Sequence, residues 1–226
     1  MRTDQLVRRL ADSPEAVRPL PHPWMRTLVW LLLSIPYLAL VVLVVSPRGD
    51  LIEQISDTRY FIEQLAALTT GIAAAAAAFV STIPGRRRAF LLLPFVPLAI
   101  WLGSLGQGCV QTWLQYGLDG LSLRPDWFCF PAITLVGAVP AIAMALMLRR
   151  GAPLTPHVTA ALGGLAAAGL GNFGLRLFHP QDASLMVLVW QFGTVFVLSV
   201  LAGWSGRYLL NWRSIIGAVR RRAAIG

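Results

Sequence analysis

Hydrophobic residues in this chain are gathered into long blocks that are separated by polar segments. Six such blocks can be delimited, at Met25–Val45, Gln64–Ile83, Ala89–Gly106, Pro131–Leu148, His157–Phe178 and Ser184 to about Leu210. Each block has close to the roughly 20 residues that a helix needs to cross the hydrocarbon core of a bilayer. The pattern therefore predicts an all-α, polytopic membrane protein with six transmembrane helices.

The segments outside these blocks divide the chain into three regions. Residues 1–24 precede the first block, residues 25–210 contain all six, and residues 211–226 form a basic tail. Asp50 and Glu53 have the spacing of a capping box, which predicts a short surface helix between the first two spans. Small residues at Gly163, Ala167 and Gly171 recur every four positions and predict close helix packing in the fifth span.

Composition supports a membrane protein, and the distribution of charge gives it an orientation. The 226 residues are 56% hydrophobic and 13% charged, whereas a soluble domain has about 25% charged residues. All 19 basic residues are arginine, and 15 of them lie in segments on one side of the six-span layout. Because basic residues are retained in the cytoplasm, we expect both termini inside, an N-in/C-in arrangement.

The basic tail carries an apolar face formed by Trp212, Ile215, Ile216 and Val219. Arg220, Arg221 and Arg222 follow that face. This pattern favours an amphipathic helix on the anionic lipid of the inner leaflet over binding to nucleic acid or to an acidic protein.

Polar residues are scarce inside the predicted spans. No Asp, Glu, His or Lys lies deep in a span, which argues against a proton-coupled transporter. Asn172 and Gln191 are the main deep polar groups, and a hydrogen bond between their helices is a simpler interpretation than a substrate site. No phosphate-binding loop, zinc-protease motif or nucleophile elbow occurs, so we expect neither an enzyme nor a cofactor.

The two cysteines, Cys109 and Cys129, both fall in the connection at 107–130, outside the spans. The simpler interpretation is structural: the two cysteines form a disulfide or are inert buried thiols. The more specific interpretation is that they sense redox state or thiophilic metals. His179, in the last outer turn, is a possible third soft ligand. The spacing defines no certain metal site.

The N-terminal region predicts a short helix with one apolar stripe. Its elements are the capping residues Thr3 and Asp4, the stripe Leu6, Val7 and Leu10, and the adjacent Ala11. Ser13 and Pro14 limit the helix to about three turns, and a proline-rich spacer leads to the first span. Such a helix gains most by docking in a partner's groove, although a disordered tail or a helix lying on lipid explains the pattern equally well.

Several short pieces of this sequence, in a fixed order along nearly the whole chain, resemble the NrsF-like family of membrane anti-sigma factors. The matching pieces are Thr3-Asp4-x-Leu6, Leu10-Ala11, Val17-Arg18-Pro19-Leu20, Pro47-Arg48, Asp50-Leu51, Pro84-Gly85-Arg86-Arg87-Arg88, Gly108-Cys109, Trp127-x-Cys129 and Arg149-Arg150-Gly151-Ala152-Pro153-Leu154. Each piece alone is weak, but their order and spacing are fairly specific.

The resemblance implies a multi-pass protein of the bacterial inner membrane. Its cytoplasmic N-terminus would hold an extracytoplasmic-function sigma factor away from RNA polymerase, with Leu6, Val7 and Leu10 in contact with that factor. Family members are thought to sense oxidising metal stress through outward-facing cysteines, one of them at the position of Cys129. A second family cysteine precedes a proline in the last outer loop, where this chain has His179 and Pro180.

This departure leaves three alternatives: Cys109 substitutes for the missing cysteine, His179 substitutes for it, or the signal differs from that of the family. Two other classes of function remain as alternatives. A small-solute transporter or channel would need deep polar groups, which are scarce, and a membrane thiol oxidoreductase would need a reactive pair such as CxxC, which is absent.

Overall fold

The computed structural model describes residues 20–83, 85, 87–117, 129–151, 153–179 and 187–210. Within these residues the chain forms seven α-helices, a 3-10 turn (η1), a π-helical segment (η3) and no strand. The elements are α2 (Pro23–Val45), α3 (Leu51–Ser56), α4 (Thr58–Ser81), η1 (Arg88–Leu92), α5 (Phe95–Tyr116), α6 (Cys129–Leu148), α7 (Pro156–Leu175), η3 (Val187–Phe192) and α9 (Gly193–Leu209).

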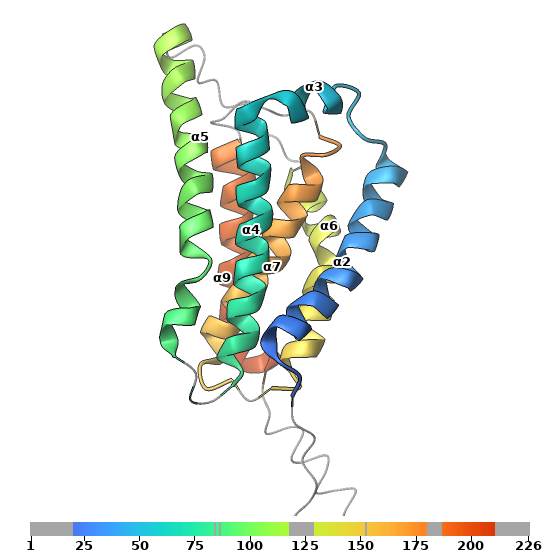
Figure 1. Ribbon diagram of the computed structural model, residues 1–226, viewed down its shortest axis with the longest axis vertical. Helices are drawn as coiled ribbons and strands as arrows, with labels where there is room; N and C mark the ends of the chain where they lie inside the picture. Colours follow the sequence, from blue (N-terminus) through green and yellow to red (C-terminus); the bar gives the residue numbers. More distant parts are fainter. Residues whose placement is uncertain are drawn as a thin grey trace, which may run out of the picture.

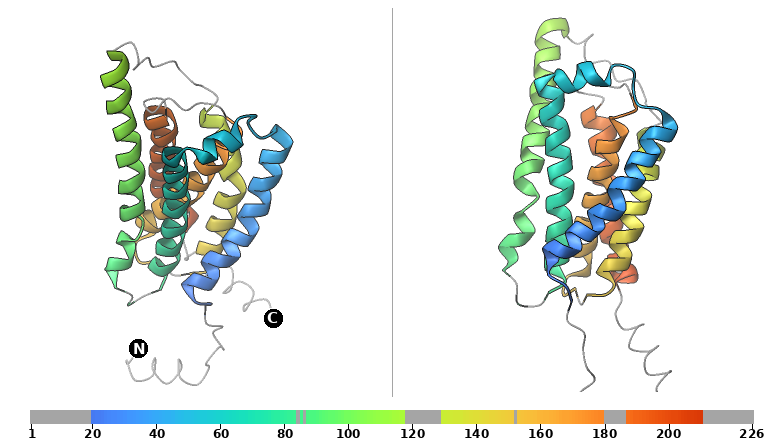
Figure 2. Two further views of the ribbon diagram at one scale, coloured as in Figure 1. Left: turned by 45° about the horizontal axis from the view of Figure 1, so that its top comes forward. Right: turned by 45° about the vertical axis from the view of Figure 1, so that its right-hand side comes forward.

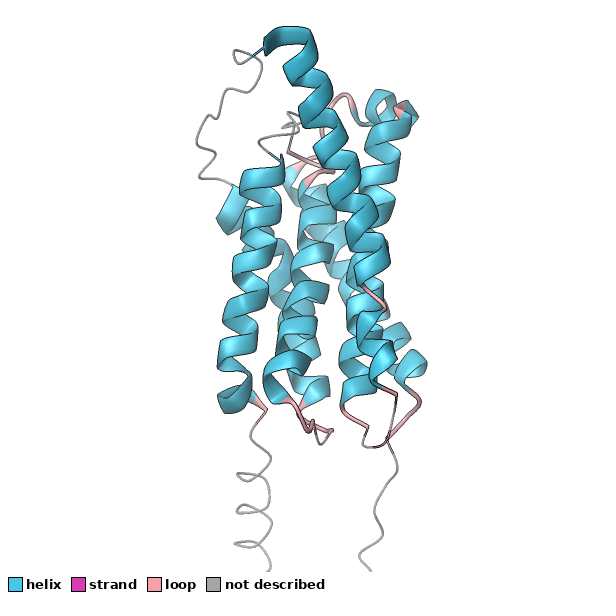
Figure 3. Cartoon of the chain, turned by 90° about the vertical axis from the view of Figure 1, so that its left-hand side faces the viewer, coloured by secondary structure: helices cyan, strands magenta, loops and turns pink. Residues whose placement is uncertain are grey.

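Six helical stretches of the described chain are long and apolar enough to cross a membrane, as predicted. They are Pro23–Val45, Thr58–Ser81, Ala89–Tyr116, Phe130–Leu148, Pro156–Leu175 and Leu188–Gly206, with mean hydropathies from 1.4 to 2.7. The helices run alongside one another as a bundle, with short connections at one end (Figures 1 and 3). The prediction of an all-α membrane fold is confirmed.

Two predicted boundaries are corrected. Both corrections place residues with reactive or charged side chains, Glu63 and Cys109, in helices rather than in connections. The second span begins at Thr58 rather than at Gln64, because the Asp57 carboxylate caps the helix by accepting hydrogen bonds from the backbone N–H groups of Arg59 and Tyr60. The third span continues beyond Gly106 to Tyr116, where a glycine with positive φ ends it.

The predicted surface helix exists as α3, but it lacks the predicted capping box. The Asp50 side chain makes no capping hydrogen bond to α3. It accepts instead from the Arg48 guanidinium, at 2.6 and 2.7 Å. An ion pair therefore replaces the cap at this helix start.

Helix α7 lies at the centre of the bundle and packs against α4, α6 and α9. Small residues allow this, because a Cβ at Gly171 would lie 2.7 Å from the Ile133 backbone oxygen on α6. A Cβ at Gly71 on α4 would likewise lie 3.2 Å from the Ala166 oxygen on α7. The predicted small-residue face of α7 is therefore an interface.

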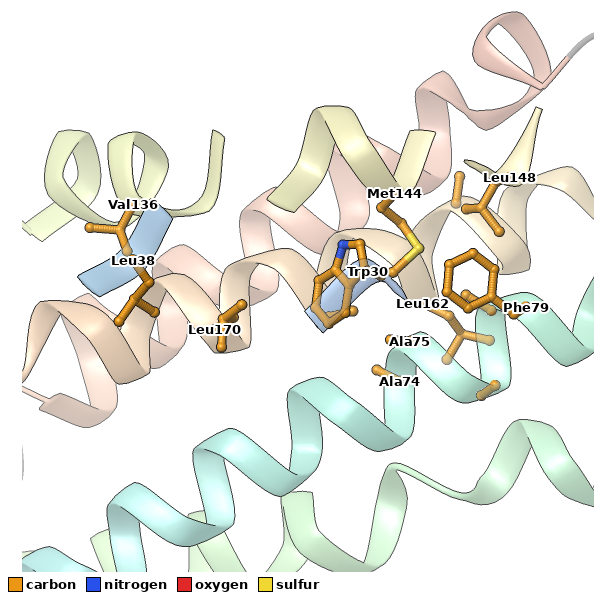
Figure 4. Close-up of a cluster of buried hydrophobic side chains, with 14 of the residues drawn as sticks. Trp30, Leu38, Ala74, Ala75, Phe79, Val136, Met144, Leu148, Leu162 and Leu170 are labelled. Carbon is orange, nitrogen blue, oxygen red and sulfur yellow. The ribbon is translucent and has the colours of Figure 1, made fainter. Parts of the chain in front are cut away.

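The main core cluster joins side chains from α2, α4, α6 and α7 (Figure 4). Trp30 of α2 and Phe79 of α4 are its largest members, and both are fully buried. The run of alanines in α4 contributes Ala74–Ala78, which are also fully buried, so the run is packing surface rather than a lipid anchor. Helix α5 stands at the edge of the bundle and packs mainly against α4 (Figure 2).

The two ends of the bundle differ in charge. All four acidic residues of the described chain, Asp50, Glu53, Asp57 and Glu63, lie on α3, its flanking residues or the first turns of α4, which we call the α3 end. Arg26, Arg87, Arg149 and Arg150 lie at the opposite end, where α2 begins and where α4 and α6 end. We call this the arginine end, and no acidic residue of the described chain accompanies these arginines there.

Candidate functional site

The predicted sigma-binding residues Thr3, Asp4, Leu6, Val7, Leu10 and Ala11 lie outside the described residues, and so do Arg220, Arg221 and Arg222 of the tail. Of the three predicted sensor residues, the structure describes the side chains of Cys109 and His179. Cys129 is the first residue of α6, and its side chain is not described.

Cys109 is a half-buried free thiol on α5, whereas the hydrophobic pattern predicted that it lies in a connection. Helix α5, which carries Cys109, packs against α4, the helix that carries Arg59 and Glu63. His179 follows the end of α7, and its backbone N–H donates to the Leu175 oxygen at 2.9 Å. Within the described ranges, no three His, Cys, Asp or Glu residues come close enough together to hold a metal ion.

A buried ion pair joins α4 to α7. Arg176, which ends α7, donates from Nη1 to Oε2 of Glu63 at 2.6 Å, and both side chains are less than 5% exposed. The other oxygen of Glu63 accepts from Nε of Arg59 at 3.1 Å. The prediction that Glu63 lies in the connection before the second span is thus wrong, because α4 starts six residues earlier than hydropathy indicated.

Tyr60 connects this pair to the end of α2. Its ring lies 4.8 Å from the guanidinium carbon of Arg176 and 5.9 Å from that of Arg48. Its hydroxyl donates to the Arg176 backbone oxygen at 2.8 Å. Two buried arginines thus contact one aromatic ring, an arrangement that stabilises cations away from water.

Arg48 fixes the segment that follows α2 onto the end of α7. Its backbone N–H donates to the Leu177 oxygen at 3.1 Å, and its guanidinium forms the two-pronged pair with Asp50. The hydrogen bond from Arg48 is the largest effect on the Asp50 carboxyl, and it lowers the pKa of that group from 3.8 to about 2. We call Arg48, Asp50, Arg59, Tyr60, Glu63 and Arg176 the charged network.

At the arginine end, α2 is held by Arg26. Its guanidinium donates to Thr82 Oγ1 at 2.9 Å and to the Met147 oxygen at 2.6 Å, and it lies 4.5 Å from the centre of the Phe79 ring. These partners belong to the C-terminal ends of α4 and α6, where helix dipoles favour a cation. Arg26 is only 4% exposed, so it acts as a buried clamp between three helices.

Two further hydrogen bonds hold the middle of α2 against α6. The indole Nε1 of Trp30 donates to the Pro140 oxygen at 2.9 Å, and the hydroxyl of Tyr37 donates to the Leu135 oxygen at 2.8 Å. Helix α2 is therefore fixed at its start, at its middle and just beyond its end.

The predicted hydrogen bond between Asn172 and Gln191 is absent. Both side chains are fully buried, yet none of their four nitrogen and oxygen atoms has a hydrogen-bond partner in the described part of the chain. Gln191 lies in the π-helical segment η3, whose wider turn directs side chains differently from an α-helix. A pairing expected from ordinary helices does not hold there.

A family model described as "Negative regulator of sigma F", NrsF, matches residues 10–212 of this chain. The chain belongs to the NrsF family. It is an anti-sigma factor, and this family is regulatory rather than enzymatic. The match contains the whole described bundle together with Leu10 and Ala11, and it starts after Leu6 and Val7.

A curated protein supports the same assignment. The anti-sigma-F factor NrsF of Caulobacter vibrioides (strain NA1000 / CB15N) is 29% identical to this chain over 216 residues. The alignment covers 94% of this chain and all of that protein. No solved structure matches the chain. The resemblance found in the sequence is confirmed at the level of the family.

Proposed function

We propose that this NrsF-family member sits in the bacterial inner membrane and holds an extracytoplasmic-function sigma factor at its N-terminal segment. Oxidative or metal stress in the envelope, acting on thiols at the outer side, would release that factor. The observation that carries this proposal is the family match, which runs through a six-helix apolar bundle and into the N-terminal region.

The difference in charge between the two ends of the bundle supports the N-in/C-in orientation. The arginine end, with Arg26, Arg87, Arg149 and Arg150, would face the cytoplasm, because basic residues next to spans stay inside. The chain enters α2 from this end, so the segment before Leu20 would be cytoplasmic. A cytoplasmic sigma factor would then be within its reach.

The proposed sigma-contacting stripe is Leu6, Val7 and Leu10, with Thr3 and Asp4 capping the helix and Ala11 beside the stripe. Three apolar residues on one face of a short helix suit a hydrophobic groove on a partner. Docking there would cover the surface that the sigma factor needs for RNA polymerase. Arg220, Arg221 and Arg222 would hold the tail on anionic lipid.

Helix α2 is the proposed connection between the sensor and this segment. It begins three residues after Leu20, and its first turns are held by Arg26 against α4 and α6. Its outer end is held by Arg48 within the charged network, which also contains Glu63 on α4, the helix against which α5 and its Cys109 pack. A chemical change at Cys109 would thus disturb contacts that position α2.

Cys109, Cys129 and His179 remain the proposed sensor residues. Cys109 is a free thiol, so it is available for oxidation or for binding a thiophilic metal. Modification there would add bulk or charge to α5, which packs against α4, the helix that carries Arg59 and Glu63.

The stripe is tested by Leu6→Asp combined with Leu10→Asp in cells that carry the sigma factor. We expect release of the sigma factor and expression of its regulon, because carboxylates do not enter an apolar groove. Gln5→Asp, off the stripe, is the matched control and should keep repression. Normal repression by the double variant, at an unchanged protein level, would rule out the stripe.

The sensor is tested separately by Cys129→Ser, Cys109→Ser and His179→Ala. Loss of induction with a normal amount of protein supports sensing by that residue. Loss of the protein itself supports a structural role, and full induction in all three variants would remove these residues from the mechanism.

A further inference from the structure

The packing of α7 against α9 sets the depth of two buried amides. The two helices run along each other in opposite directions, and Gly164 fixes their register, because a Cβ there would lie 3.1 Å from the Cα of Ser199. Eight residues beyond Gly164 toward the α3 end is Asn172, and eight residues before Ser199 is Gln191. If α9 continued as an ordinary α-helix through Gln191, the two amides would face each other.

The core one turn away supports this register. Ala168 and Val195, each four residues from one of the amides, belong to the same core cluster. Asn172 and Gln191 are themselves 0% exposed, and none of their four polar side-chain atoms has a hydrogen-bond partner in the described part of the chain. A buried amide without a partner costs free energy, and two facing amides can satisfy each other.

The helix type at Gln191 keeps the two amides apart. The segment Val187–Phe192 is π-helical, and its wider turn rotates Gln191 away from the direction that a continued α9 would give it. The junction with α9 has room to change, because a Cβ at Gly193 would meet no atom within 4 Å. The hydroxyl of Thr194 donates to the Trp190 backbone oxygen at 2.6 Å, and a side-chain bond of this kind satisfies backbone groups where helix type changes.

We propose that η3 is a two-state element of the bundle. In the first state, the one described above, it is π-helical and both amides are unpaired. In the second state it is α-helical, and the amide of Gln191 is hydrogen-bonded to that of Asn172. The extra residue in a π turn makes such a shift of register available, and π-helical turns within α-helices occur frequently at functional sites.

The position of η3 gives this conversion consequences for the rest of the bundle. The segment contacts α5, α6 and α9, so a change in its helix type reaches three helices at once. Asn172 also lies one turn before Arg176, whose guanidinium holds Glu63 in the charged network. This inference does not depend on the sigma factor or on the thiols.

Trp101 on α5 reports the helix type of η3. Its ring is fully buried and lies 5.7 Å from the ring of Phe192, edge to face, so conversion of η3 changes the surroundings of the indole. The full chain is labelled with fluorotryptophan, placed in lipid nanodiscs and measured by fluorine NMR with saturation transfer. Trp101→Phe assigns the signal.

Three variants and one control test the two states. Gln191→Leu and Asn172→Leu each remove one amide, and Gln111→Leu, at an exposed position on α5, is the matched control. Deletion of Val189, which is exposed, removes one residue from the π-helical segment and favours the α-helical state.

We expect Trp101 of the wild type to exchange between two environments, with a minor population of about 0.1–10%. Each leucine variant should lower that population about tenfold, as the loss of one buried hydrogen bond implies, and the two changes combined should lower it no further. Deletion of Val189 should make the minor environment the major one. Gln111→Leu should behave as the wild type does.

Three results would overturn the proposal. One is a single environment of Trp101 in the wild type. Another is an unchanged minor population in both Gln191→Leu and Asn172→Leu. The third is a loss of stability in Gln191→Leu with the Trp101 signals unchanged, which would mean that the amide is held by a fixed water molecule in a single state.

Discussion

Replacing Glu63 by glutamine tests how far the fold depends on its buried ion pair. The change keeps the size of the side chain and removes its charge. Arg176 is 2% exposed and Glu63 is 3% exposed, so the arginine would be left in the bundle without its counter-charge. Breaking a buried pair from one side typically costs about 3–5 kcal/mol.

The loss should lie near the lower end of that range. The amide oxygen of Glu63→Gln can still accept a hydrogen bond from Arg176, and the ring of Tyr60, 4.8 Å from that guanidinium, still favours a cation. We therefore expect a loss of about 3 kcal/mol in the free energy of unfolding. Arg176→Gln should cost less, since Arg59 still pairs with Glu63.

The assay is reversible unfolding in mixed micelles, followed by tryptophan fluorescence and circular dichroism at matched protein concentration. Glu53→Gln, an exposed carboxylate on α3, is the control and should stay within about 0.5 kcal/mol of the wild type. The double variant Glu63→Gln with Arg176→Gln should lose less free energy of unfolding than the two single variants lose together. The difference should be at least about 1 kcal/mol.

Equal stabilities of Glu63→Gln and Glu53→Gln would contradict this prediction. Strictly additive effects of Glu63→Gln and Arg176→Gln would also contradict it. Either result would mean that the pair is solvated within the bundle, so that neither charge depends on the other.

Two further predictions concern packing and acid. Gly171→Ala should destabilise the bundle by about 1–3 kcal/mol, because its Cβ would lie 2.7 Å from the Ile133 oxygen. A Cβ at Gly103 would have no atom within 4 Å, so Gly103→Ala should change the stability by less than about 1 kcal/mol. Thermal unfolding of both variants checks this, and equal losses of stability would contradict it. The pKa of Asp50 is lowered by Arg48 to about 2, so its ion pair stabilises the fold fully above about pH 4 and is lost as pH falls through 2. Asp50→Asn should therefore remove part of the acid sensitivity between pH 4 and 2, and identical pH profiles of variant and wild type would argue against it.

The helices could be predicted from the sequence because apolar blocks of spanning length have few other structures available in a bilayer. The small-residue face of α7 was predictable for a similar reason, since Gly171 leaves room for a neighbouring backbone. These features depend on local patterns that the chain displays directly.

The charged network could not be predicted from the sequence, because a span predicted from hydropathy ends at the first charged residue on either side. Glu63 was therefore assigned to a connection, although the Asp57 cap starts the helix before it. The partner of Glu63, Arg176, is 113 residues away, and no local pattern pairs them. Cys109 was placed in a loop for a related reason, because glutamines and a threonine beyond Gly106 resemble a connection but continue α5.

The absent pairing of Asn172 with Gln191 has a different cause. Position along the spans predicted that both amides lie at similar depth, but the direction of a side chain depends on helix type. The hydrophobic pattern does not distinguish the π-helical segment Val187–Phe192 from an ordinary α-helix.

We propose that the N-terminal segment captures the sigma factor while the membrane bundle positions that segment. Pull-down from mild detergent, with the whole chain and with a variant that lacks residues 1–20, measures whether that segment is needed for capture. We expect the whole chain to retain a sigma subunit of RNA polymerase, identified by mass spectrometry, and the shortened chain, equally well folded, to retain none. Equal recovery of the sigma subunit with both proteins would contradict it.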